Sequence, residues 1–326
     1  MKTGSMDVTW RREELAMAAH NDSALRGSCR STCQPERQEA TNDEGDVQPM
    51  ADFKVDALKV GEMYDSVSRF YEAWMGSSFH LSYWFGDDDD TSAAEAADRL
   101  THKVGDTLGL LPSHHLLDAG CGTGGPAIAL AVKTGARVTG ISVSPVGVEF
   151  ANNRAQEHGL SDRVHFEQGD YMSTRFGDDS FDAVLAIESL EHAPDLSQVL
   201  REFFRVLRPG GRFSLASYSS DSPMTKEEAE RYRKFWMINF PPSLTEWLDV
   251  VRGAGFEVDE YTECGARVAK HAARILDILT SRQEELVAKF GQGPGVEESM
   301  AEFSDIVSLI EKHNGYVIIA ARKPTR

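Results

Sequence analysis

One stretch of the chain decides its fold: LLDAGCGTGG, residues 116–125. It leaves an apolar strand, passes through closely spaced glycines and enters the apolar helix expected at 127–134. Glycines let a backbone approach a ligand closely, but such a loop alone also serves dinucleotide and phosphate sites. Asp118 stands two positions before the first glycine, where a carboxylate can meet a ligand amine or cation, and no P-loop lysine follows. The loop therefore favours a nucleoside that carries an amino acid over a pyrophosphate.

Apolar strands and helices of about ten residues alternate on both sides of this loop. The expected strands before residue 218 are 116–119, 137–141, 164–168, 181–187 and 212–217, and the expected helices are 127–134, 146–158 and 196–207. This alternation predicts an α/β fold with a parallel sheet covered on both faces. A polar insertion that bears aromatic residues, 225–240, then precedes a helix at 244–252. We expect strands at 256–261 and 316–321, separated by helices near 268–290 and 297–311.

Composition divides the chain into four regions. Residues 1–49 are polar and lack aromatic residues after Trp10, so we expect a disordered N-terminal extension. Residues 50–112 show apolar positions at helical spacing and predict a helical cap. Residues 113–218 form the ligand-binding core, and 219–326 supply lid helices and the last strands of the sheet.

Charge and cysteine content exclude several functions. The 326 residues carry a formal net charge of −18, which repels nucleic acids and anionic membrane surfaces, so we expect neither as a partner. The four cysteines are scattered, and the close pair Cys29 and Cys33 has no second pair at a metal-binding distance, so we expect no metal. Residues 1–20 do not resemble a signal peptide, and we expect a cytoplasmic protein.

Four motifs in this order resemble the class I S-adenosylmethionine-dependent methyltransferases. They are the glycine loop, Gly169-Asp170-Tyr171 after the third strand, Phe181-Asp182-Ala183-Val184 in the fourth, and Leu207-Arg208-Pro209-Gly210-Gly211 before the fifth. The resemblance implies a Rossmann-like seven-stranded sheet with N-terminal helices and a helical lid inserted after the fifth strand. It also implies S-adenosyl-L-methionine as cofactor and S-adenosyl-L-homocysteine as product.

Within this class the chain resembles a branch that acts on small molecules. The segments 138–144 and 187–195 carry the likeness, supported by 64–65, 80–84 and 315–317. The branch includes rifamycin and rebeccamycin O-methyltransferases, with ubiquinone, tocopherol and sterol C-methyltransferases more distant. It implies a methyltransferase of natural-product and antibiotic biosynthesis.

The resemblance assigns a set of cofactor-binding residues. These are Asp118, Gly120, Gly122, Gly124, Ser142, Asp170, Tyr171, Tyr83 and Trp84. The chain departs from the family at two of the ribose positions. Ser142 stands where many members have an acidic residue, and Gly147 stands where the branch often has glutamine, which leaves the ribose contacts open.

His192 is the expected general base, because it follows the fourth strand at the edge where ligands bind and because an imidazole, with an ordinary pKa near ~6.5, suits proton abstraction at neutral pH. A capping or packing role is the alternative. Glu188 and Glu191 flank the same corner and suit carbon methylation, in which a carboxylate stabilises a carbocation. Alternatively, Glu188 supports the cofactor loop and Glu191 faces solvent. Tyr64 completes the expected catalytic set as an aromatic roof, although core packing would also explain it.

Two features concern the acceptor. The aromatic residues Phe235, Trp236 and Phe240 of the insertion predict a mobile apolar cover, and therefore a bulky, apolar small-molecule acceptor. An interface of a homo-oligomer is the alternative for the same residues.

Related O-methyltransferases often carry two adjacent histidines where this chain has Glu191 and His192. This departure keeps open a second function, a cyclase or rearrangement enzyme that binds the cofactor without net methyl transfer.

Overall fold

The computed structural model describes residues 55–74, 78–86, 88–269, 271, 274, 281, 305–306 and 308–325. The extension expected at 1–49 and most of the helices expected at 268–290 and 297–311 lie outside the described residues. In the latter region the structure gives the short helix α8 and a helical stretch at 308–313. None of the described helices is both long and apolar enough to span a membrane.

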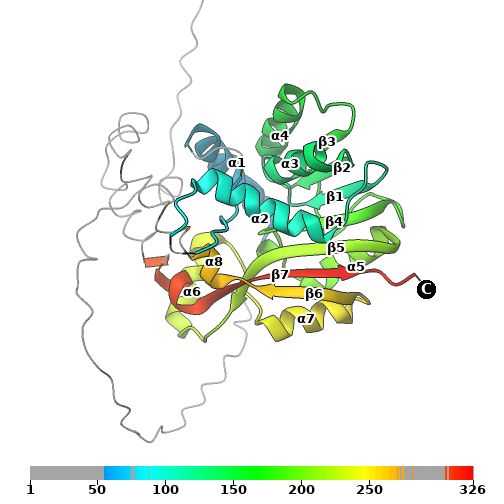
Figure 1. Ribbon diagram of the computed structural model, residues 1–326. Coiled ribbons are helices and arrows are strands. Elements are labelled where there is room, and N and C mark those ends of the chain that lie inside the picture. Colours follow the sequence, from blue (N-terminus) through cyan, green and yellow to red (C-terminus); the bar gives the residue numbers. More distant parts are fainter. Residues whose placement is uncertain are drawn as a thin grey trace, which may run out of the picture. The chain divides into compact units, whose positions relative to one another are not determined.

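A seven-stranded mixed sheet forms the centre of the protein, in the order β3-β2-β1-β4-β5-β7-β6 (Figure 1). The strands are β1 His115–Ala119, β2 Arg137–Ser142, β3 Val164–Gln168, β4 Phe181–Ile187, β5 Leu207–Ser220, β6 Glu257–Glu263 and β7 Asn314–Arg322. Strands β1 to β5 pair in parallel with one another, whereas β7 is antiparallel to both β5 and β6. The order reverses direction beside β1, between β2 and β4, where such sheets bind ligands outside the carboxyl ends of the strands.

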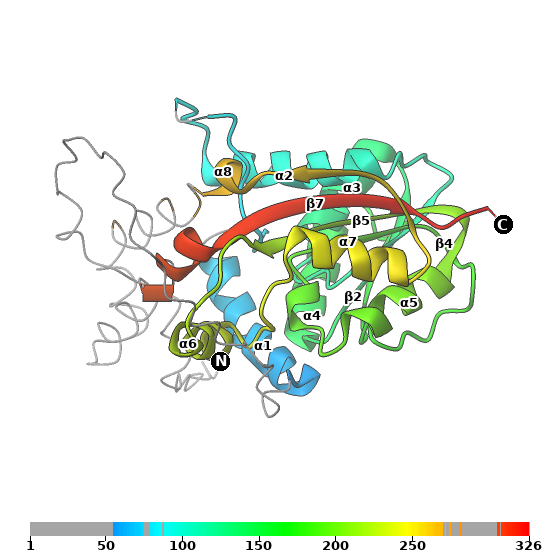
Figure 2. The same ribbon diagram turned by 90° about the horizontal axis from the view of Figure 1, so that it is seen from below.

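Helices cover both faces of the sheet (Figure 2). They are α1 Ala57–Trp74, α2 Ala93–Thr107, α3 Gly125–Thr134, α4 Pro145–Glu157, the 3-10 turn η2 Leu190–His192, α5 Leu196–Val206, α6 Lys226–Trp236, α7 Leu244–Gly253 and α8 Gly265–Val268. One core cluster joins the sheet to α2, α3, α4 and α8. The other joins it to α5 and α7. The two clusters give the sheet the three-layer arrangement expected of an α/β domain.

Local sequence explains where the helices begin and which face they bury. In α5, Val199, Leu200, Phe203 and Val206 are buried at helical spacing, and the Asp195 side chain caps the first turn. Capping boxes begin α6 and α7, with Thr225 and Ser243 as the N-caps. Each capping residue and its partner lie within one short segment, so the helix starts can be predicted from the sequence.

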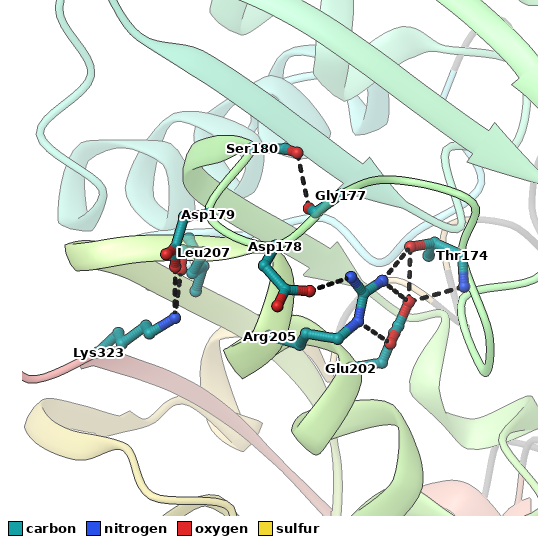
Figure 3. A network of polar contacts seen from close by, with 9 residues as sticks. All are labelled: Thr174, Gly177, Asp178, Asp179, Ser180, Glu202, Arg205, Leu207 and Lys323. Carbon is teal, nitrogen blue, oxygen red and sulfur yellow. Dashed lines mark hydrogen bonds and ion pairs between the residues drawn. The ribbon is translucent and has the colours of Figure 1, made fainter.

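A polar network joins the loop after β3 to α5 (Figure 3). The Arg205 guanidinium donates to Glu202 and, at 2.7 Å, to Asp178, and Glu202 also accepts the Thr174 N–H at 2.8 Å. Lys323, which follows β7, forms an ion pair with Asp179 in the same loop at 2.7 Å. The network holds the 174–180 loop against α5.

The sheet and its N-terminal helices confirm the expected fold class, with two differences in detail. The antiparallel β7 departs from the fully parallel sheet that the alternation predicted, since the connection from β6 to β7 places the last strand between β5 and β6. The fifth strand begins at Leu207 rather than Arg212, because the Pro-Gly-Gly turn is included in it as an irregularity in the pairing with β4. The division of the chain into cap, core and lid stays a prediction.

Candidate active site

The glycine loop leaves β1 and is fixed to β2. The amides of Gly120 and Cys121 both donate to the Ile141 carbonyl, at 2.9 and 3.0 Å. Gly120 has a φ of 91°, and a Cβ there would lie 2.3 Å from the Ser189 Cβ. A side chain at residue 120 is therefore excluded by both conformation and space. The Ser189 hydroxyl in turn donates to the Ala119 carbonyl at 2.7 Å, which joins the loop to the end of β4.

Asp118 lies at the carboxyl end of β1, directly below this loop. Asp118 is 3% exposed, and its Oδ2 has no hydrogen-bond partner among the described residues. Burial raises the pKa of this carboxyl to about 7. Burying a carboxyl oxygen without a hydrogen bond costs free energy, and a ligand ammonium that donated to this oxygen would remove that cost. Asp118 and the glycines therefore fit the amino-acid end of S-adenosylmethionine.

The end of β2 is tied to the N-terminal helix α1. Asp65 accepts the Ser144 hydroxyl at 2.6 Å and the Val146 amide at 3.2 Å. Ser142 is 8% exposed, and its hydroxyl accepts the Ser144 amide at 3.2 Å. A Cβ at Gly147 would lie 3.0 Å from the Gly122 carbonyl, so this position packs α4 closely against the glycine loop. Asp65 therefore positions α1 over the site, a contact that the sequence did not reveal.

The expected adenine-side residues follow β3. The Asp170 carboxylate accepts the Met172 amide at 2.8 Å and so closes a local turn. The Tyr171 hydroxyl donates to the Ser189 carbonyl at 2.7 Å. Burial, followed by the nearby carboxylates Glu191 and Asp170, raises the pKa of Tyr171 well above its usual value. The structure thus brings Tyr171 to the end of β4, while its contact with the cofactor stays a prediction.

Tyr83 and Trp84 pack toward α2. The Tyr83 ring lies 6.0 Å from Phe85, and Trp84 is 1% exposed with its indole N–H donating to the Thr91 carbonyl. Phe79 is the aromatic residue against the glycine loop, since a Cβ at Gly122 would lie 3.4 Å from its ring. The cofactor roles of Tyr83 and Trp84 stay predictions, and Phe79 is an additional candidate that the sequence motifs did not single out.

Glu188 joins three segments of the site. It follows β4 with a φ of 45°, a conformation that a residue with a side chain rarely adopts. Its Oε1 accepts the Leu81 amide and the Tyr316 hydroxyl, each at 2.7 Å. Burial, and then repulsion by Glu191, raises the pKa of Glu188 to about 8. The carboxyl is therefore mostly neutral at pH 7 and holds the 78–86 segment and β7 against the end of β4.

Glu191 is buried in the same corner, whereas the alternative interpretation placed it in solvent. It is 7% exposed, and its Oε1 accepts the Ser217 hydroxyl at 2.6 Å. Its Oε2 has no hydrogen-bond partner among the described residues. Burial raises its pKa, and the hydrogen bonds from Ser217 and Tyr218 only partly oppose this. Glu188 and Glu191 thus place two carboxyls without a described cation partner in the segment between β4 and His192.

His192 and Tyr64 meet across 128 residues of sequence. The Tyr64 hydroxyl lies 2.9 Å from His192 Nε2, and the two rings pack edge to face. His192 Nδ1 lies 3.2 Å from the Met237 carbonyl, which can only accept, so Nδ1 carries the proton and Nε2 accepts from Tyr64. Burial lowers the pKa of His192 to about 4. The imidazole is therefore neutral at pH 7 with Nε2 unprotonated, and it is a weaker base than the ordinary imidazole on which the sequence-based expectation rested.

The insertion after β5 packs beside this corner. Phe235, Trp236 and Phe240 are half-buried against a cluster centred on Tyr232 and Ile238. A pocket of about 390 Å³ lies between η2, the beginning of α5 and the segment after α6. Phe240 and Trp247 line it together with Glu191, whereas neither His192 nor Tyr64 is among its described lining residues.

The comparisons with known proteins agree with this geometry. Residues 111–265 match a methyltransferase domain family. The chain is 34% identical over 276 residues to the methyltransferase GfsG of Streptomyces halstedii, an alignment that covers 83% of this chain and 96% of that protein. The chain belongs to the class I S-adenosylmethionine-dependent methyltransferases. This methyltransferase is also 35% identical to the 27-O-demethylrifamycin SV methyltransferase of Amycolatopsis mediterranei, with 82% and 97% of the two chains covered.

A solved structure is similar over the same range. The methyltransferase superposes on the [4+2]-cyclase SpnF with a TM-score of 0.74 and 32% identity, covering 84% of this chain and 98% of that one. The family assignment confirms that S-adenosylmethionine is the cofactor of this enzyme and that its relatives act in natural-product biosynthesis. Asp65 and Tyr316 lie in segments that carry the family resemblance, but no local sequence signal shows that they contact Ser144 and Glu188, or that Ser217 contacts Glu191.

Proposed function

We propose that this methyltransferase transfers a methyl group to a hydroxyl oxygen of a bulky, largely apolar small molecule of specialised metabolism, such as a polyketide, macrolide, glycoside or terpenoid. The contact between His192 Nε2 and the Tyr64 hydroxyl carries the proposal. Methylation of an oxygen requires the acceptor to be aligned and to lose its proton, and a neutral imidazole is the group best suited to remove it.

The cofactor end of the site supports this proposal. S-adenosylmethionine, when bound, supplies an electrophilic methyl group on a sulfonium. Asp118 would hold the amino group of its amino-acid portion, since the Oδ2 of that carboxyl has no described partner. A Cβ at Gly120 would meet Ser189 and one at Gly124 would meet Phe166, so these glycines let the loop pack closely against the sheet. Ser142 ends β2 and Asp170 follows β3, at the edge of the sheet where the nucleoside would lie.

The acceptor proton has a defined route in the proposal. The hydroxyl of the acceptor donates to Tyr64, and Tyr64 donates to His192 Nε2, so the proton that leaves the acceptor is balanced by one that arrives on the imidazole. The imidazolium that forms is stabilised by the Met237 carbonyl, which accepts the hydrogen bond from Nδ1. Glu188 acts differently, because its Oε1 already accepts two hydrogen bonds and it holds the 78–86 segment in place.

An apolar acceptor suits the residues that follow β5. The half-buried rings of Phe235, Trp236 and Phe240 lie in the element next to the His192 corner and provide apolar surface for a lid. The relative that acts on 27-O-demethylrifamycin SV modifies a molecule of this kind, and its similarity extends over nearly the whole of its length. We propose the same acceptor class for this chain, while the homo-oligomer interface remains the competing role for these rings.

The test uses the full chain and a methyl-labelled donor. Purified protein is incubated with trideuteromethyl S-adenosylmethionine and a panel of hydroxylated polyketides, macrolides, glycosides and terpenoids, and the products are analysed by mass spectrometry. We expect one class to gain a labelled methyl group on oxygen. A labelled methyl group on carbon would contradict oxygen methylation and favour the catalytic roles of Glu188 and Glu191. Transfer to small polar acceptors alone would contradict the proposed acceptor class.

One observation favours a second function, that of a cyclase: the chain is 32% identical to a structure described as a [4+2]-cyclase. In this alternative the chain binds the cofactor but rearranges its substrate without net transfer. The same labelling experiment separates the two, since a rearranged product of unchanged mass, without a label, supports the cyclase.

A further inference from the structure

The segment that follows α6 is bound to the catalytic turn η2 by contacts that none of the sequence motifs includes. The Asn239 amide donates to the Glu191 carbonyl at 2.8 Å, and the Asn239 side-chain amide donates to the Ala193 carbonyl. Together with the contact between His192 Nδ1 and the Met237 carbonyl, three hydrogen bonds join residues 237–239 to residues 191–193. Asn239 therefore contacts the residues on both sides of His192 in the chain.

These contacts decide which nitrogen of His192 can act as a base. A histidine with two free nitrogens can place its proton on either, and the hydrogen bond at one of them selects the tautomer. The Met237 carbonyl selects the form with the proton on Nδ1, which leaves Nε2 to face Tyr64. If residue 237 moved away, the proton could occupy Nε2, and the nitrogen that faces Tyr64 could no longer accept.

The Met237 carbonyl needs outside support to stay in this position. Met237 ends α6 with φ 51° and ψ 40°, a left-handed conformation that is unfavourable for a residue with a side chain. The residues on either side supply the support: Ile238 is 6% exposed in the cluster around Tyr232, and Asn239 is held on η2 by two hydrogen bonds. Of these supports, only the Asn239 side chain can be removed without changing the apolar packing.

We propose that Asn239 is a positioning residue, which holds the lid segment on η2 so that the Met237 carbonyl keeps His192 in the tautomer that accepts at Nε2. The proposal rests on the proposed role of His192 as the base. It makes the tautomer of His192 depend on the position of the lid segment, because the Met237 carbonyl moves away from Nδ1 when this segment is displaced from η2. Methyl transfer would then be confined to the state in which the lid is in place.

The test reads the tautomer directly and needs no acceptor. Full-length protein labelled with ¹⁵N-histidine is saturated with S-adenosylhomocysteine, and the ring nitrogens are observed by NMR. The chain has 10 histidines, so a His192→Gln variant identifies the His192 signals by their loss. We expect wild type to show a protonated Nδ1 and an unprotonated Nε2, and Asn239→Ala to show a mixture of the two tautomers.

Asn314→Ala is the matched control. The Asn314 side-chain amide donates to the Tyr232 hydroxyl at 2.6 Å, so this variant removes an asparagine bond to α6 without touching η2. The control should keep the wild-type tautomer. The proposal is overturned if Asn239→Ala keeps it as well, or if both variants lose it equally. Calorimetry with S-adenosylhomocysteine on the same samples tests cofactor binding separately. Normal turnover in His192→Gln would instead overturn the proposed base and leave the tautomer result to stand on its own.

With an acceptor in hand, turnover gives a second readout. Asn239→Ala should lower kcat about tenfold and leave the KM for the cofactor unchanged, since a misplaced general base slows the chemical step without weakening binding. An increase in the KM for the cofactor with unchanged kcat would contradict a positioning role.

Discussion

Two groups of carboxylates in this protein behave in opposite ways. Glu202 lies on α5 and Asp178 on the 174–180 loop. Figure 3 shows their oxygens directed at the guanidinium of Arg205. Burial alone would raise the pKa of Glu202, but hydrogen bonds from Arg205 and Thr174 outweigh it and lower the pKa. Both carboxylates are thus paired with Arg205 and partly exposed.

The carboxyls at the ends of β1 and β4 have no such partner among the described residues. Asp118 and Glu191 are buried and Glu188 is half-buried, and burial is the largest cause of the raised pKa of each. An unpaired buried charge is costly, so burial favours the protonated form of such a carboxyl, and none of the three forms an ion pair that stabilises the fold. The difference separates a region that stabilises the protein from one that is kept for binding and chemistry.

Asp118 offers the strongest test of this difference. Replacement by Asn keeps the size and removes the charge, and we expect S-adenosylhomocysteine affinity to fall at least 10²-fold, because a buried charge pair is lost. In wild type the affinity should also fall by up to tenfold per pH unit below about pH 7, since a protonated Asp118 must lose its proton to pair with the ligand ammonium.

Calorimetry at several pH values checks both statements. The Asp118→Asn variant should bind weakly with no pH dependence in this range. Equal affinities for the two proteins at pH 8 would show that Asp118 does not face the ligand.

The next effect concerns the pair of Tyr64 and His192. We expect His192→Ala to lower turnover by about 10² or more, which is the usual loss when a general base is removed. Tyr64→Phe should lower it by about tenfold, because the phenol relays the proton to Nε2. Single-turnover rates with saturating cofactor measure both. If Tyr64→Phe is as active as wild type, the acceptor reaches His192 directly and the relay is wrong.

A stability experiment compares the two groups of carboxylates directly. The folded-state pKa of Glu188 is about 8, above its unfolded value near 4.5, so its contribution is complete below about pH 4.5 and is lost as the pH rises through 8. Glu188→Gln keeps an oxygen for Leu81 and Tyr316 and avoids that loss. From pH 5 to pH 8 the variant should therefore gain about 3 to 4 kcal/mol in unfolding free energy relative to wild type, because each pKa unit corresponds to ~1.4 kcal/mol.

Glu202→Gln is the control with the opposite sign. The folded pKa of Glu202 is lowered, so its contribution is present above the unfolded pKa and is lost as the pH falls through the folded value. The Gln variant should lose stability relative to wild type at pH 8 rather than gain it. Denaturant unfolding of cofactor-free protein measures both, and the same sign for the two variants would show that the two groups do not differ.

Arg205 should give only a small effect. Its ion pairs are partly exposed, and such pairs contribute about 1 kcal/mol or less each. We expect Arg205→Ala to lower the melting temperature by a few degrees at low salt and to leave S-adenosylhomocysteine affinity unchanged. Thermal unfolding and calorimetry check this, and a large loss of affinity would mean that the network supports the site as well as the fold.

The sequence predicts the parts of the site that lie within one segment. The glycine loop, Asp118 and His192 each follow a strand that periodicity can place, so their position at one edge of the sheet follows from the fold. Helix starts such as Ser243 are legible for the same reason, since a cap and its partner are three residues apart.

The sequence does not predict the pairings across the site. Tyr64 with His192 and Glu188 with Tyr316 are each separated by 128 residues, and their distances depend on how whole elements pack. The Asn239 contact is invisible in the sequence because one asparagine in a lid segment has no periodic or motif signal.

A crystal structure of the full chain with S-adenosylhomocysteine would show whether Asp118 and the His192 corner face the same ligand. We expect the amino group of the ligand within about 3 Å of Asp118 Oδ2, and its sulfur directed toward the pair of Tyr64 and His192. A ligand whose amino group pairs with another residue, or whose sulfur points away from His192, would contradict this assignment of the site.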